Sequence, residues 1–180
     1  MPGLIDAIYL APRAKADPTA VGRVLAVVDR GLEGDRYFLG LGAFSRWPGE
    51  GRAVTLIEAE AVEAIRAEAG VDLSDGRHRR NLVSRGVRLP DLLGKTFRVG
   101  GAVLRGSRLC LPCRYLERLV APGLYGAMRG NRGGLRAEVV EGGEIAVGDA
   151  IEPVDRAPSS AVMRPRRGRG AVGGLTPPPR

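Results

Sequence analysis

Histidine, cysteine and long apolar segments are scarce in this sequence, and each shortage excludes a class of protein. No apolar run approaches the roughly 18 to 20 residues that a membrane-spanning helix needs. Two cysteines and one histidine are only part of the ligand set of a closed zinc site. No internal repeat, G-x-G-x-x-G loop or Walker-type phosphate loop is present. Zinc-finger, dinucleotide-binding and P-loop proteins are therefore poor matches.

The N-terminus lacks the basic region and the apolar segment of a signal peptide, which predicts a cytoplasmic location without membrane partners. In that compartment the two cysteines are expected to be free thiols, metal ligands or redox groups rather than a structural disulfide. A chain of 180 residues is long enough for one domain with a substantial core. We predict a domain over residues 1–155 and a tail over residues 156–180.

Most of the net charge of +8 lies in this tail. Residues 156–180 contain six arginines and no acidic residue, which leaves +2 for residues 1–155. The tail is also rich in proline and glycine and has few large apolar side chains, so we predict that it is disordered. The tail could contact nucleic acid or an acidic partner, or it could be a solvated and dispensable extension. The low charge of the main domain argues against a nucleic-acid-binding face there.

Short β-like segments separated by glycine turns dominate the main domain. The segment 58–68 is the clearest helix, because Ala61, Val62 and Ile65 share one face and Gly70 follows. Two Gly-Gly pairs predict hairpins, one joining residues 96–99 to 102–105 and one joining 135–140 to 144–151. Further strands are expected at residues 4–10, 21–28, 52–57 and 82–83. This pattern predicts a mainly β protein, a β-barrel with a few peripheral helices.

Both cysteines lie where the β-like pattern changes to a helical one. Pro112 suits a first helical turn, which would place Cys113 in that turn as well. Free N–H groups there favour a thiolate, and Arg108 and Arg114 add positive charge. Cys113 is therefore a candidate thiolate that binds a soft metal or carries sulfur, with Cys110 incidental or a resolving thiol. A dithiol redox pair, half a zinc site and two inert buried thiols remain alternatives.

A second candidate site is the basic loop over residues 74–81. Its arginines could bind phosphate or carboxylate, because guanidinium groups form paired hydrogen bonds with such oxygens, or they could pair with nearby acids. His78 is the only histidine, and this cationic setting disfavours its protonated form. Asp35 and Arg36 lie in a glycine-bounded turn at the end of a strand, where Asp35 could instead cap its own turn.

Taken together, these segments resemble the MOSC family, named after the C-terminal domain of molybdenum cofactor sulfurases. The resemblance covers about residues 4–153, and that family's fold is a β-barrel with peripheral helices. It rests on residues 31–36, on 54–57 before the helix, on Arg80 and Asn81, on 109–113, and on Gly148 and Asp149.

The resemblance implies a site for molybdenum cofactor, with Cys113 as molybdenum ligand or sulfur carrier. The basic loop would hold the phosphate or pterin portion, and Asp35 and Arg36 would line the same pocket. We assign cofactor binding to Asp35, Arg36, Arg79, Arg80, Asn81 and Arg114.

Family members either accompany a pyridoxal-phosphate-dependent sulfurating enzyme or reduce N-hydroxylated compounds such as amidoximes and hydroxylaminopurines. The resemblance therefore implies a small N-hydroxylated substrate or sulfur transfer. This sequence has no pyridoxal-phosphate domain and no ferredoxin-like cysteine cluster, so the sulfur or electron donor is expected to be a separate protein. The alternative is a non-catalytic cofactor carrier or partner-binding barrel that docks to another protein or to nucleic acid through its basic tail.

Overall fold

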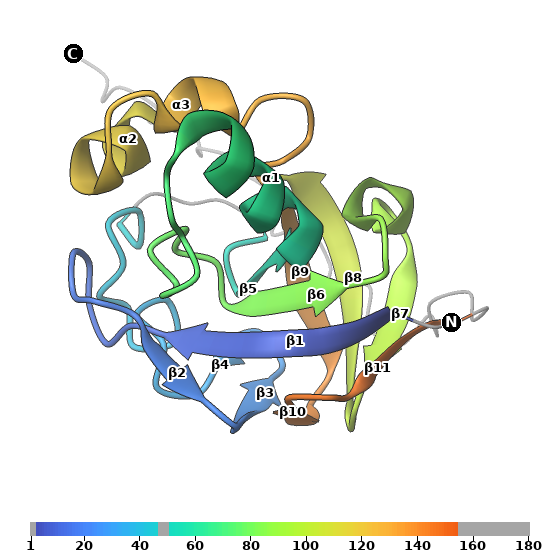
Figure 1. Ribbon diagram of the computed structural model, residues 1–180. Helices are drawn as coiled ribbons and strands as arrows, with labels where there is room; N and C mark the ends of the chain where they lie inside the picture. The colour runs from blue at the N-terminus through green and yellow to red at the C-terminus, as the bar shows by residue number, and fades with distance from the viewer. Residues whose placement is uncertain (1–2, 47–50, 155–180) are drawn as a thin grey trace, which may run out of the picture.

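The computed structural model describes residues 3–46 and 51–154, which form a closed β-barrel with helices on one side (Figure 1). The predicted mainly β fold is thereby confirmed. The predicted tail, residues 156–180, lies outside the described residues. No helix in the described ranges is long and apolar enough to span a membrane.

Seven strands close the barrel. Their spatial order around the barrel is β1 (Gly3–Leu10), β11 (Ala150–Pro153), β7 (Thr96–Val99), β8 (Ala102–Leu109), β9 (Leu135–Glu141), β5 (Val54–Glu58) and β6 (Leu82–Arg85), which pairs with β1 again. Neighbouring strands are antiparallel except for β5 and β6, which are parallel. A parallel pair needs a crossover, and helix α1 (Ala59–Ala69) lies in that connection.

The remaining strands form short additions to the barrel. Strand β2 (Thr19–Val21) extends the sheet beside β1. A separate sheet contains β10 (Gly143–Ala146), β3 (Arg23–Val27) and β4 (Gly31–Leu32). The expected strand over residues 21–28 is thus divided between two sheets.

The predicted hairpin across the second Gly-Gly pair is wrong, because β10 pairs with β3 rather than with β9. Strand β10 begins at Gly143, which packs against the turn between β7 and β8. A Cβ atom at Gly143 would lie 2.2 Å from the carbonyl oxygen of Gly101. Glycine at this position therefore allows the backbones of residues 143 and 101 to approach closely, where the chain leaves the barrel sheet to join β3.

Two apolar clusters stabilise the fold. The first fills the barrel and includes the fully buried Leu56, Phe97 and Leu104. The second includes Ile57 and Ile65 and lies between the barrel wall and the helices. It contains residues of α1, of α2 (Arg114–Val120) and of α3 (Leu124–Ala127). A 3-10 helix, Leu89–Leu92, connects β6 to β7. These contacts fix the helical side of the barrel, where the candidate site lies.

Candidate functional site

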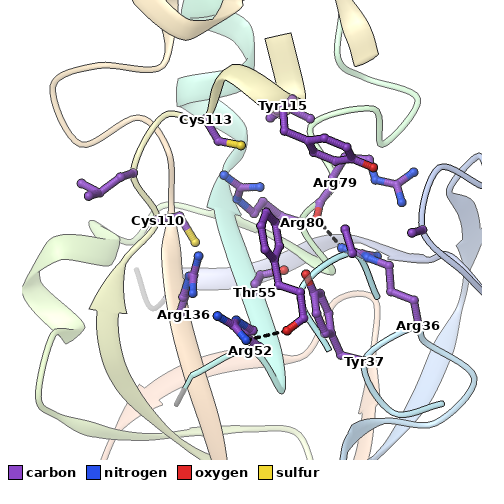
Figure 2. Close-up of a pocket in the computed structure, with 15 residues that line it drawn as sticks. Arg36, Tyr37, Arg52, Thr55, Arg79, Arg80, Cys110, Cys113, Tyr115 and Arg136 are labelled. Carbon is purple, nitrogen blue, oxygen red and sulfur yellow. Dashed lines mark hydrogen bonds between the residues drawn. The ribbon is translucent and has the colours of Figure 1, made fainter. Parts of the chain in front are cut away.

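A pocket of about 100 Å³ opens beside the cysteine segment. Its wall combines guanidinium groups with thiols, and no carboxylate lines it in the part of the chain that is described. Figure 2 shows these side chains around one space. The charged and thiol members are Arg36, Arg52, Arg79, Arg80, Arg136, Cys110 and Cys113.

The cysteine segment forms one side of this pocket. Cys110 is buried, Cys113 is partly exposed, and both are free thiols. The Cys110 N–H donates to the carbonyl of Gly134 (2.8 Å), and a Cβ atom at Gly133 would lie 1.9 Å from the carbonyl oxygen of Cys110. Glycine at position 133 is therefore required for the strand and the cysteine segment to pack this closely.

Helix α2 begins at Arg114, two residues after Pro112, which the sequence placed in its first turn. Cys113 has extended backbone angles (φ −138°, ψ 126°) and is the N-cap residue, so Pro112 precedes the helix instead of lying in its first turn. The carbonyl of Cys113 accepts the N–H of Glu117 (3.2 Å), which is the first hydrogen bond of the helix. The thiol thus lies at the junction of loop and helix, on the pocket side (Figure 2).

Asp35 is the centre of a buried polar network behind the pocket. Its carboxylate accepts hydrogen bonds from Arg36 Nη1 (3.1 Å), Asn81 Nδ2 (3.0 Å) and the N–H groups of Ala11 and Tyr37. Its side chain is buried, with 1% of its surface exposed to solvent. Asn81 also accepts from the hydroxyl and the N–H of Thr55. This network fixes the direction of Arg36, because a charge buried this deeply needs its partner.

Arg79 and Arg80 come from the loop before β6, and backbone carbonyls hold both side chains. Arg79 Nη1 donates to the carbonyl of Ala16, and Arg80 donates to those of Gly133 (Nε, 2.8 Å) and His78 (Nη1, 3.1 Å). Arg79 adopts a left-handed φ of 64°, which is strained for a non-glycine residue. Burial and then the charge of Arg36 lower the pKa of Arg79.

His78 is buried beneath this loop and accepts one of its backbone hydrogen bonds. Its side chain is 1% exposed, and its Nδ1 accepts the N–H of Arg80 (2.9 Å), so the neutral ring carries its proton on Nε2. Burial, and then the positive charge of Arg80, lower the pKa of His78 from 6.5 to about 3. The expectation that this histidine is neutral agrees with that environment.

The neutral His78 predicts a pH dependence of stability. In the unfolded chain His78 is protonated with a pKa near 6.5, whereas in the folded chain its pKa is about 3. The unfolded state therefore binds more protons between these values, and the free energy of unfolding falls as the pH falls through this window. The loss approaches about 1.4 kcal/mol per pH unit between pH 6 and pH 5, before most carboxylates titrate. Urea unfolding at pH 7, 6 and 5 measures it. His78→Asn, whose side-chain oxygen can replace Nδ1, should remove this slope, and an equal slope in both proteins would contradict the assignment.

The structure brings together four of the predicted site residues at the pocket wall, namely Cys113, Arg36, Arg79 and Arg80. Asp35 and Asn81 lie behind the wall and act on it through Arg36 and Thr55. Arg114 is not among the lining residues. Its guanidinium pairs with Glu117 (2.9 Å) and lies 4.3 Å from the ring centre of Tyr125.

Several pocket residues were not predicted from the sequence. Arg136 alternates with the buried Leu135 and Ala137 of β9, a pattern that indicates only a surface position on a strand. Tyr115 and Phe44 come from segments far apart and meet edge-to-face, with ring centres 6.2 Å apart. Nothing in the sequence around Tyr115 or Phe44 predicts this contact. Arg52 lies in the segment 52–57 that the sequence predicts as a strand, whereas β5 begins at Val54, and nothing in the sequence assigns Arg52 to the pocket.

The fold and the site define a closed β-barrel domain whose pocket presents arginines and thiols. The family model of the MOSC domain matches residues 45–152, and the chain therefore belongs to the MOSC domain family. This confirms the resemblance inferred from the motifs. A comparison with curated proteins gave no match.

Solved structures share this fold. The YuaD protein of Bacillus subtilis is 20% identical, with a TM-score of 0.69 over 85% of this chain and 96% of that one. YiiM of Geobacillus stearothermophilus is 20% identical, with a TM-score of 0.66 over 86% of this chain and 76% of that one. YiiM of Escherichia coli is also 20% identical, with a TM-score of 0.63 over 87% and 71%. At this identity the likeness concerns the fold alone.

Proposed function

We propose that this protein binds molybdenum cofactor in the arginine pocket, with the Cys113 thiolate as the protein's ligand to the metal. One observation carries the proposal: five guanidinium groups and two free thiols line a single pocket that has no carboxylate among its described lining residues. Guanidinium groups suit a phosphate, and a thiolate suits a soft metal. A phosphorylated, metal-bearing ligand needs both.

The donor set fits a metal that arrives inside a larger ligand. Within residues 3–46 and 51–154, no group of three or more histidine, cysteine or acidic side chains could hold a bare ion. A single thiolate from Cys113 is enough only when the cofactor supplies the other ligands of the metal. The molybdenum cofactor meets this requirement through the sulfur atoms of its pterin.

The residues predicted from the sequence to bind the cofactor then have distinct tasks. Arg79 and Arg80 would hold the cofactor phosphate, because their side chains are already fixed by carbonyl groups. Arg36 adds a cation whose position Asp35 sets. Asn81 would act by holding Asp35 and Thr55 in place. Arg114 lies beside Cys113 in the sequence and would add positive charge there.

The proposed reaction is the reduction of a small N-hydroxylated compound with electrons from a separate donor protein. The bound cofactor supplies two-electron chemistry at an oxygen atom. The chain itself holds the metal through Cys113 and orients a flat substrate against Phe44 and Tyr115 at the pocket wall. A substrate assay with cofactor-loaded protein and an artificial electron donor tests this step.

Sulfur transfer is the second candidate, and the presence of Cys110 in the same pocket favours it. Cys113 would then carry a persulfide sulfur received from a separate donor, and Cys110 would be the resolving thiol. Mass spectrometry of the full chain after incubation with a persulfide donor distinguishes the two. A sulfur atom added to Cys113 that then passes to an acceptor supports transfer, whereas reduction of N-hydroxylated compounds without such an adduct supports the oxidoreductase.

Arg80→Ala is expected to weaken cofactor retention by about 1–3 kcal/mol, as for a lost charge-assisted hydrogen bond. The reason is that Arg80 lines the pocket while two of its donors are fixed on carbonyl groups. The cofactor dissociation rate of the loaded protein measures the effect. Arg77→Ala is the matched control, because Arg77 lies in the same loop but pairs with Asp75 outside the pocket. Equal rates in both variants would contradict the phosphate assignment.

A further inference from the structure

Arg136 is a pocket arginine whose charge no other described residue balances. It lies in β9, is partly exposed, and lines the pocket. Its side chain has no hydrogen-bond acceptor or carboxylate among the described residues. Its partner across the ladder on β8 is Arg108 instead of an acid. Since like charges in register destabilise a sheet, this arrangement costs stability unless an anion compensates for it.

Arg136 also lies across the pocket from Arg79, one of the two arginines proposed to hold the cofactor phosphate. In Figure 2 the guanidinium groups of Arg136 and Arg52 lie on one side, below Cys110, those of Arg36 and Arg79 lie on the opposite side, and that of Arg80 lies between them. One phosphate held between Arg79 and Arg80 would therefore leave Arg136 without a counter-charge. The pocket has cations for two anions.

We infer that the pocket contains two anion positions, and that Arg136 forms the second, which binds a phosphate group of the substrate. Arg52 lies beside it, with its Nη1 donating to the carbonyl of Phe44 (2.7 Å). The planar guanidinium fork of Arg136 matches the oxygens of a phosphate monoester, whose charge is close to −2 at neutral pH. The existence of two positions follows from the arrangement of the arginines. Assigning the second one to a substrate rests on the proposed function.

The first test counts anions and needs no cofactor. Inorganic phosphate is titrated into the full chain in 0.15 M chloride and followed by phosphorus NMR and calorimetry. We expect two phosphates per chain in the wild type, and one each in Arg136→Met and Arg80→Met. Arg108→Met removes the same charge from the exposed neighbour on β8 and should keep both. One phosphate in the wild type, or two in Arg136→Met, would overturn the inference.

A more conservative variant keeps the test decisive if Arg136→Met does not fold. Arg136→Lys keeps the charge but loses the planar guanidinium group. It should therefore lower the affinity for the second phosphate about tenfold and leave the affinity for the first unchanged. Thermal unfolding of every variant is measured in parallel. Unchanged affinity for both phosphates in a folded Arg136→Lys protein would also contradict the assignment.

The second test identifies the source of the anion. With cofactor-loaded protein, the ratio of kcat/KM for a phosphorylated over an unphosphorylated N-hydroxylated compound with the same ring should fall at least about tenfold in Arg136→Met and stay constant in Arg108→Met. Loss of molybdenum from Arg136→Met would instead assign the second position to the cofactor and overturn the substrate assignment. If the protein binds no cofactor at all, the proposed function fails, while the phosphate count still decides whether two positions exist.

Discussion

Replacing Asp35 with alanine is expected to lower the free energy of unfolding by about 3–5 kcal/mol, the usual cost of removing one partner of a buried ion pair. The carboxylate is 1% exposed and accepts four hydrogen bonds, and the Arg36 side chain paired with it is only 9% exposed. Without Asp35, the Arg36 guanidinium keeps, among the described residues, the carbonyl of Arg79 as its one hydrogen-bond acceptor and a contact with the ring of Tyr37. Urea unfolding at pH 7 measures the loss.

Asp75→Ala is the control for this prediction. Asp75 also pairs with an arginine, but both side chains are about half exposed, so its loss should cost no more than about 1 kcal/mol. The double variant Asp35→Ala with Arg36→Met should recover part of the stability, because it removes the unpaired charge as well. Equal losses for Asp35→Ala and Asp75→Ala would show that the buried network does not support the fold.

Cys113→Ala is expected to reduce molybdenum retention by far more than tenfold. Losing a residue that merely orients a metal ligand typically costs about 10–100-fold in affinity, and Cys113 is proposed as the ligand itself. Molybdenum per chain after gel filtration, in protein from cells that make the cofactor, measures the effect. The change should leave folding intact, because the thiol is partly exposed and α2 uses the backbone of this residue.

The second thiol provides the matched control for Cys113. Cys110→Ser keeps a small side chain in the same pocket, so molybdenum retention should stay within about twofold of the wild type if Cys110 is no ligand; a hydroxyl at this buried position costs stability instead. Loss of molybdenum in Cys110→Ser with retention in Cys113→Ala would exchange the two roles and refute the assignment to Cys113.

Local signals were sufficient to predict much of the fold. Helix α1 follows from its apolar spacing and from Gly70, which ends it in a left-handed conformation (φ 66°). The first hairpin follows from its Gly-Gly turn, and β7 and β8 pair as expected. The second pair failed because Gly142 and Gly143 serve close backbone packing, and a glycine pair alone does not show which of the two roles it has.

Some residues of the candidate site could be predicted from local sequence, and others could not. Cys113, Arg79 and Arg80 stand in compact segments rich in reactive or charged residues, so the sequence indicates them. Arg136 and Phe44 reach the pocket only through strand register and loop packing, which are long-range properties. Asp35 was predicted to line the pocket, but the backbone turns it inward, where it positions Arg36.

The central claim is that this barrel is a cofactor protein, and one measurement tests it most directly. Full-length wild-type protein is produced in cells that synthesise molybdenum cofactor, and its molybdenum and pterin contents are determined together. The account predicts molybdenum and pterin in equal amounts, close to one of each per chain. Protein that carries neither, although the same cells load another molybdenum protein, would contradict it.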